Sequence, residues 1–269
     1  MYEEPYKWVE AVGNRRQYLD EQFKQGSPVV ALAYDAGILL LTVSKGTPKL
    51  YEIYDRLALG GMGHPADLEK LRFSLLEMAH VEGFNRSPSD VAGSRMVKYG
   101  IAPVIKQAFE EIFKAPFIVK ILLAELGQRA CKNSFLVINY DGTFEEGSSC
   151  AVLAVSKSVE QDMVSYLRRE APTMPSLEQA FGIALRTWAL GDRLQRKVAE
   201  ESSEGSPAEG KPEHMEAASL YDYLRERLTE KNVECALLDR DQSGSSKYRT
   251  LSSDDVSRLL PKDLRATLP

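Results

Sequence analysis

The sequence predicts an α+β fold in which sheets are stacked between helical layers. Segments with strand patterning and segments with helix patterning come in separate blocks, an order that excludes a repeating βαβ fold. The 269 residues are 43% hydrophobic and 27% charged, which is enough apolar material for a sizeable core. We therefore expect one globular unit with a short tail.

Charge and apolar patterning exclude several classes of partner. The net charge is −5, and no stretch interleaves Lys and Arg with aromatic residues as nucleic-acid-binding segments do. The N-terminal MYEEPYKWVE is acidic and polar, unlike a signal peptide, and the apolar runs VVALAY and ILLLTV are too short to span a bilayer. We expect a cytoplasmic protein that binds neither nucleic acid nor membrane.

The cysteines indicate neither a disulfide framework nor a zinc site. Cys131, Cys150 and Cys235 lie far apart and show no CxxC spacing. Reduced thiols buried in the core are the expected state, and no metal or other cofactor is predicted.

The chain begins with a predicted helix and two predicted strand pairs. Residues 5–25 are rich in helix formers, open with a proline and end at Gly26. The runs VVALAYD and ILLLTV predict an antiparallel hairpin. The segment 49–63 predicts a second pair of strands, and we expect these four strands to form one sheet.

Two helical segments follow. The first begins after Gly63-His64-Pro65, and its apolar residues share one face at helical spacing: Leu68, Leu71, Leu75 and Met78. Residues 88–114 repeat such a stripe, although Pro103 should kink or break the helix. Both segments are predicted to cover a sheet.

A second group of strands and helices is predicted after residue 115. FIVKILLAELG, SFLVINYDGTFEEG and CAVLAVS have strand character, with a tight turn at Asp141-Gly142, and we expect them to form a second sheet. Two antiparallel helices follow, with Ser-x-x-Gln capping boxes at 158–161 and 176–179.

The C-terminal part resumes after a polar segment. Residues 199–214 consist mostly of Glu, Ser, Gly and Pro, which predicts a disordered, solvated loop. The helix ASLYDYLRERL, the strands ECALLDRD and KYRTLS, and a helix opened by Ser252 or Ser253 complete the same unit.

This arrangement resembles the four-layer αββα sandwich of the proteasome family, a fold of N-terminal-nucleophile hydrolases. Residues 26–44 resemble the first hairpin of the family, and residues 49–67 resemble its next strand pair and the start of a helix. VECALLDRD and YRTLSSDDVSRLL resemble the C-terminal strands and helix of bacterial, actinobacterial-like α subunits. Four pieces in the family's order indicate this resemblance over almost the whole chain.

The residues at the catalytic positions distinguish the α type from the β type. A β-type subunit uses a Thr at a processed N-terminus, supported by an acid and a Lys. The matching positions here carry Ser27, Val43 and Lys49, so the carboxylate is missing. The resemblance implies a non-catalytic α subunit of a 20S core. One alternative is a self-processing hydrolase that uses Ser27 after losing residues 1–26; another is a solitary protein of this fold that only binds partners.

The resemblance also implies how the chain is divided. Residues 1–26 would carry a gate segment and the helix that marks α-type subunits, residues 27–260 the sandwich, and residues 261–269 a tail. The gate would be the N-terminal tetrapeptide Met1, Tyr2, Glu3 and Glu4. It lacks the Tyr-Asp-Arg gate motif of archaeal and eukaryotic α subunits, which favours the bacterial type.

Lys49, Gly63 and His64 are the predicted binding residues. In the family, the matching Lys lines a pocket between neighbouring subunits and pairs with the C-terminal carboxylate of an activator tail. Gly63 matches a pocket glycine, and His64 beside it can hold a carboxylate when protonated. The alternatives are a solvated Lys, a glycine that merely ends a strand, and a helix-start His.

By resemblance, the partners are other copies of the chain in a homo-heptameric ring, proteasome β subunits, a ring-shaped AAA ATPase activator and protein substrates in transit. Trp8, Tyr18 and Phe23 on the first helix are candidate ring contacts, with packing onto their own sheet as the alternative. Residues 199–214 are interpreted as a solvated insertion, with recruitment of a regulator as the alternative.

Overall fold

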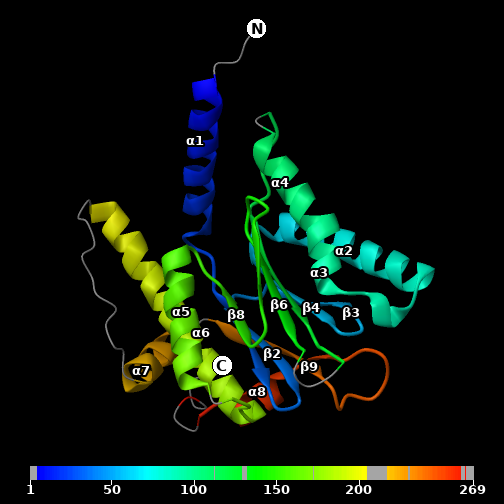
Figure 1. Ribbon diagram of the computed structural model, residues 1–269. Helices are drawn as coiled ribbons and strands as arrows, with labels where there is room; N and C mark the ends of the chain where they lie inside the picture. Colours follow the sequence, from blue (N-terminus) through cyan, green and yellow to red (C-terminus); the bar gives the residue numbers. More distant parts are fainter. Residues whose placement is uncertain are drawn as a thin grey trace.

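A computed structural model describes residues 5–111, 113–128, 132–171, 173–204, 217–229, 231–261 and 264. Within this part of the chain, two five-stranded antiparallel sheets pack against each other, and helices cover the outer face of each (Figure 1). The predicted four-layer αββα sandwich is therefore confirmed. None of the described helices is long and apolar enough to cross a bilayer.

The first sheet has the strand order β10-β9-β2-β1-β8. Its strands are β1 (Val29–Tyr34), β2 (Gly37–Ser44), β8 (Cys150–Leu153), β9 (Asn232–Asp239) and β10 (Tyr248–Thr250). The predicted hairpin of β1 and β2 is present, with Tyr34 opposite Gly37. Strand β9 runs along the whole of β2 and brings Asn232 opposite Ser44, so residues from the two ends of the chain become neighbours.

The second sheet has the strand order β3-β4-β5-β6-β7. Its strands are β3 (Leu50–Tyr54), β4 (Leu57–Gly63), β5 (Val119–Glu125), β6 (Ser134–Ile138) and β7 (Phe144–Gly147). The expected tight turn lies between β6 and β7, where Gly142 has a φ of +79°. A backbone in that region favours glycine, as the sequence indicated.

The expectation that the first four strands form one sheet is wrong. After β2 the chain crosses to the other sheet, where β3 and β4 pair with β5, and later β8 returns to pair with β1. The crossing is fixed by Glu234 of β9, whose carboxylate accepts hydrogen bonds from the backbone N–H of Lys49 (3.0 Å) and of Leu50 (2.8 Å). Period-2 patterning identifies strands but not the sheet to which each belongs.

Helices on the second sheet follow the predicted pattern. They are α2 (Pro65–Asn85), α3 (Gly93–Met96) and α4 (Ala102–Glu110), with a short helix η1 (Pro88–Asp90) and a π-helical turn η2 (Val97–Ile101) between them. Leu68, Leu71 and Leu75 of α2 are buried against the sheet. Pro103 lies in the first turn of α4, directly after the π-helical turn η2, and the backbone stays helical from α3 through η2 into α4. The helix is therefore irregular before the proline, but the predicted break is absent.

The first sheet is covered by α5 (Lys157–Glu170), α6 (Leu177–Glu204), α7 (Ala217–Leu228) and α8 (Ser253–Leu259). The capping box at Ser176 is confirmed, because Ser176 and Gln179 exchange hydrogen bonds. The cap predicted at Ser158 is wrong: Ser156 Oγ accepts from Val159 N and starts α5 two residues earlier, so Ser158 lies inside the first turn. Ser252 caps α8 with a capping box.

Helix α6 extends into the segment predicted as a loop. Residues 199–204 are helical, because Ala and Glu at its start are good helix formers that continue an established helix. Residues 205–216 lie outside the described part of the chain.

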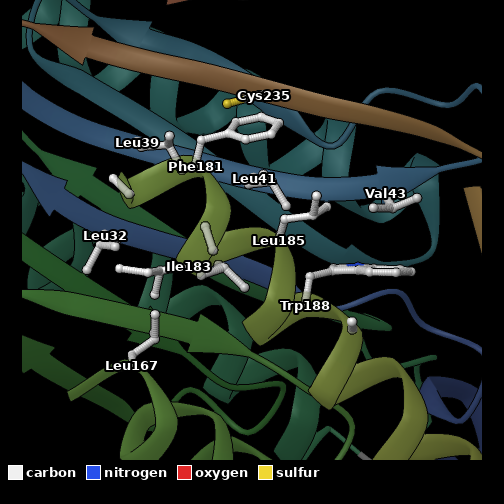
Figure 2. Packing of buried hydrophobic residues seen from close by; sticks show 14 of the residues in the cluster. Leu32, Leu39, Leu41, Val43, Leu167, Phe181, Ile183, Leu185, Trp188 and Cys235 are labelled. Carbon is white, nitrogen blue, oxygen red and sulfur yellow. The ribbon is translucent and has the colours of Figure 1, made fainter. Parts of the chain in front are cut away.

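Apolar clusters fill each of the three layer boundaries. Figure 2 shows part of the cluster between the first sheet and its covering helices. Side chains of β2 there face those of α6: Leu39, Leu41, Val43, Phe181, Leu185 and Trp188. Trp188 is fully buried at the end of this row, beside the start of β1.

Helix α1 (Pro5–Phe23) projects from the sandwich beside α4 (Figure 1). Phe23 at its base is fully buried in the cluster between the sheets, whereas Trp8 and Tyr18 are 45% and 49% exposed. Arg15 fixes its course by donating to backbone carbonyls at the end of α4, among them Phe109 O at 2.8 Å. The C-terminal half of the helix is therefore held by buried side chains at its base, by Arg15 and by a hydrogen bond from Tyr140 Oη to Asp20 at 2.9 Å.

Candidate functional site

Ser27, at the position expected for a nucleophile, is held in a closed hydrogen-bond network. Its side chain is 6% exposed; Oγ donates to Val43 O at 2.6 Å and accepts from Trp188 Nε1 at 3.0 Å. The neighbouring Thr42 hydroxyl, which is fully buried, donates to Pro28 O at 2.7 Å. We call Ser27, Thr42, Val43 and Trp188 the floor. It uses the single donor of Ser27 and leaves Val43 where an acid would be needed.

A cleft of about 340 Å³ opens above the floor, and we call it the Lys49 cleft. Its lining includes Ser27, Lys45, Lys49, Gly63 and Lys231. Two of the three predicted binding residues are therefore brought together: Lys49, which directly precedes β3, and Gly63, which ends β4.

Lys49 is half-buried at the start of β3. Burial lowers the pKa of its ammonium group, and the attraction of Glu234 and then of Asp192 opposes that shift. An ammonium group that has lost hydration in this way gains more from an anion than an exposed one does. Burial conversely raises the pKa of Glu234, whose oxygens are already used by backbone N–H groups.

Gly63 ends β4 with a φ of +128°. A Cβ at this position would collide with the backbone carbonyl of Ile118, so the backbone itself requires glycine. The residue therefore has a structural role and also leaves the wall of the Lys49 cleft without a side chain.

His64 lies outside the Lys49 cleft. It is exposed and caps α2, where its Nδ1 accepts from Ala66 N at 3.3 Å. It lines a different groove, beside Lys70 and Phe117. The predicted gate residues Met1, Tyr2, Glu3 and Glu4 lie outside the described part of the chain.

Sequence reasoning missed Lys231, which immediately precedes β9 and lines the Lys49 cleft. No local motif marks it, because only the pairing of β2 with β9 places it near Lys49. Burial lowers the pKa of Lys231 to about 8; Asp192 opposes the shift, and Arg227, Arg196 and Lys49 add to it. Its ammonium group lies 5.6 Å from the centre of the Trp188 ring.

Asp192 of α6 was also missed and organises the neighbourhood of Lys231. It is 5% exposed and accepts from Tyr223 Oη at 2.6 Å, Arg227 Nε at 3.0 Å and Arg196 Nε at 3.3 Å. Lys231 Nζ lies 3.8 Å from its other oxygen. Burial alone would raise the pKa of Asp192, but the Tyr223 hydrogen bond and the three cations overcome it and lower that pKa.

No protein-family model matches the chain. It is similar to the "Proteasome subunit alpha" of Actinosynnema mirum, with 26% identity over 249 residues that cover 92% of this chain and 83% of that protein. The protein of the same name from Kineococcus radiotolerans is 29% identical over 221 residues, covering 80% and 87%. That of Acidothermus cellulolyticus is 27% identical over 209 residues, covering 77% and 83%. The resemblance to bacterial proteasome α subunits is thereby confirmed over most of the chain.

Proposed function

We propose that the chain is a non-catalytic α subunit of a 20S proteasome core, acting in protein degradation. The observation that carries this proposal is the similarity, over 92% of the chain, to a protein named proteasome subunit alpha. In this role it forms a ring with other copies of itself and caps a ring of proteolytic β subunits. The outer ring gates the entry of protein substrates, and the protein works in the cytoplasm.

The floor supports the absence of catalysis in this chain. An N-terminal nucleophile needs a free α-amine beside its hydroxyl, which would require cleavage between Gly26 and Ser27. The Gly26 carbonyl accepts from Gln195 Nε2 at 2.9 Å, and the Ser27 hydroxyl is held by Val43 and Trp188. A hydrolase that uses Ser27 would have to break this network and would still lack an acid at Val43.

The Lys49 cleft supports docking of an activator. A polypeptide end carries a carboxylate, and Lys49 supplies a cation for it in a partly desolvated site. Gly63 leaves space for the backbone of a tail. One such ion pair is worth about 1 kcal/mol, but a ring presents several identical clefts, so a ring-shaped AAA ATPase with several tails gains avidity. His64 would act only at the rim, through its exposed ring.

Ring assembly and gating follow from the layout proposed for the chain: a gate and helix in residues 1–26, the sandwich in 27–260 and a tail in 261–269. Helix α1 offers Trp8 and Tyr18, large side chains that stay about half exposed in the single chain, as contacts with a neighbouring subunit. Such an interface joins two different surfaces of the subunit, so repeated copies form a closed ring only if the rotation between neighbours returns to the first copy. Otherwise the copies would assemble into a filament. The gate would be the tetrapeptide before α1.

Co-expression with a β-type subunit, followed by native mass spectrometry, tests the proposal. The expected result is a particle of stacked rings that contains equal numbers of the two chains and degrades an unfolded protein. The chain alone should degrade nothing. A chain that stays monomeric in the presence of the β subunit would contradict the proposal and favour a solitary protein of this fold.

A further inference from the structure

We propose that the Lys49 cleft and an adjoining basic pocket form one anion-binding groove, and that its ligand is a polypeptide tail with an acidic side chain upstream of its terminal carboxylate. This inference rests on the proposed function and deepens it, because it specifies which tails the groove selects. The carboxylate would lie at Lys49 and the acidic side chain near Lys45 and Lys231.

The groove is built from two neighbouring cavities. The second cavity, which we call the Asp192 pocket, has a volume of about 390 Å³ and shares Gln25, Lys45 and Lys231 with the Lys49 cleft. Each volume lies within the range of cavities that hold small ligands. Because the shared residues line both cavities, a ligand longer than one residue can contact the two at once.

The groove is basic in a chain whose net charge is −5. Among the described residues that line it, six are basic: Lys24, Lys45, Lys49, Arg196, Arg227 and Lys231. Two are acidic, Asp192 and Glu200. A concave surface that concentrates one sign of charge attracts the opposite sign, which favours an acidic ligand.

The internal ion pairs leave an excess of positive charge. One carboxylate, that of Asp192, faces Arg196, Arg227 and Lys231. Asp192 lines the pocket as well, but it is only 5% exposed and its carboxylate is shared among the three cations. Lys24 is paired with Glu21 at 2.6 Å and contributes less.

The lining favours a polypeptide over a nucleic acid. None of the described residues that line the two cavities is aromatic, so no platform is offered on which a base would stack. The wall near Lys49 is formed by Gly61, Gly63, Pro48 and Pro65, which leaves backbone-sized space beside the cation. An extended tail fits such a wall better than a planar base does.

Lys231 gives the groove a pH dependence. It is faced by Asp192 and Arg196 from α6, by Arg227 from α7 and by Lys49 from the start of β3. Since burial lowers the pKa of Lys231 to about 8, its charge is present below that pH and is lost above it. The selective contact with the acidic side chain should therefore weaken as the pH rises through 8.

The test is fluorescence anisotropy with labelled octapeptides and the full chain. One series ends in a free carboxylate and carries a single Glu that is moved stepwise along the peptide; matched peptides carry Gln instead of Glu or end in an amide. We expect Glu at one or two adjacent positions to tighten binding roughly threefold to fivefold over Gln. Lys45→Ala and Lys231→Ala should remove that gain, and Lys98→Ala, a change to an exposed lysine outside the groove, should keep it.

The outcomes separate the two proposals. If Glu and Gln peptides bind equally at every position while amidation weakens both, this inference is wrong and the docking role of Lys49 stands. If no free-carboxylate peptide binds, both fail.

A second readout is the pH dependence. The advantage of Glu over Gln should decline between pH 7 and pH 9 in the wild-type chain, as Lys231 loses its proton. Lys231→Arg should retain the advantage, since a guanidinium stays charged. Equal pH profiles for the two chains would show that Lys231 does not contact the acidic side chain of the peptide.

Discussion

The floor and the groove above it are neighbouring regions with opposite chemistry. In the floor, the Ser27 hydroxyl is bonded on both sides and Trp188 is fully buried. In the groove, half-buried and exposed lysines line open space, and one carboxylate faces three cations. The floor is satisfied internally, whereas the groove is complementary to something outside the chain.

This difference separates two possible roles of Lys49, which are support of a nucleophile and binding of an external anion. By resemblance, three positions match the catalytic residues of a β-type subunit; they carry Ser27, Val43 and Lys49, and only Lys49 has the matching residue type. Here it faces the cleft instead of tuning a hydroxyl that is already bonded elsewhere. Substitutions in the floor and at the buried Asp192 should therefore change stability, and substitutions of the lysines that line the groove should change binding.

Among the substitutions considered, Trp188→Ala should reduce the free energy of unfolding the most. Trp188 is fully buried between α6 and β2, and its removal leaves a cavity as well as an unpaired Ser27, which should cost about 3–5 kcal/mol of unfolding free energy. Urea denaturation measures it. Trp188→Phe is the matched control, which keeps most of the volume and should cost clearly less. Equal losses for both variants would show that the hydrogen bond, not the packing, dominates.

Asp192→Asn should cause the second-largest loss of stability. It leaves Arg196, Arg227 and Lys231 without their shared carboxylate, and because Arg196 is exposed the cost should be about 2–3 kcal/mol. The pKa of Asp192 is lowered on folding, so the stability it contributes is present above its ordinary value of 3.8 and is lost as the pH falls below that value. Thermal unfolding from pH 6 to pH 3 should show a steeper loss for the wild type than for the variant. Parallel curves would contradict this role.

Ser27→Ala should destabilise the chain by about 1–2 kcal/mol. It removes the acceptor of the Trp188 N–H and the donor to Val43 O, both in a buried setting. Thr42→Val removes a neighbouring buried hydroxyl and serves as the control for general polarity of the floor. A Ser27→Ala chain more stable than the wild type would indicate that Ser27 is strained for function.

Lys49→Met should have the smallest effect on stability, within about 0.5 kcal/mol. Burial already lowers the pKa of this lysine, so replacing it with an apolar side chain of similar length removes a desolvation cost. Binding of a peptide with a free C-terminus should nevertheless weaken severalfold in the anisotropy assay. A large loss of stability would show that Lys49 has a structural role, like the residues of the floor, and would contradict a role in binding alone.

Much of the fold was predictable because its signals are local. The stripe of Leu68, Leu71 and Leu75, the irregular helical turn before Pro103 and the capping box at Ser176 all depend on spacing within a few residues. The distribution of strands between the sheets was not predictable in this way, because the contact that directs the chain across comes from Glu234, far along the sequence.

The residues of the candidate site likewise fall into those that the sequence could indicate and those that depend on long-range contacts. Lys49 and Gly63 were found through family resemblance, and both line the cleft. His64 was chosen for standing next to Gly63, but a helix begins there and turns its ring to another groove. Lys231 and Asp192 carry no motif and become neighbours only when β9 pairs with β2 and α7 packs on α6.

Intact-mass spectrometry tests most directly whether the chain is non-catalytic. The purified chain is measured after prolonged incubation with a hydroxyl-reactive fluorophosphonate and, separately, with a β-lactone. We expect a single full-length species of 30.0 kDa with no adduct, because Ser27 is buried and follows the helix α1. Loss of residues 1–26, together with an adduct on Ser27, would contradict it and establish a self-processing hydrolase.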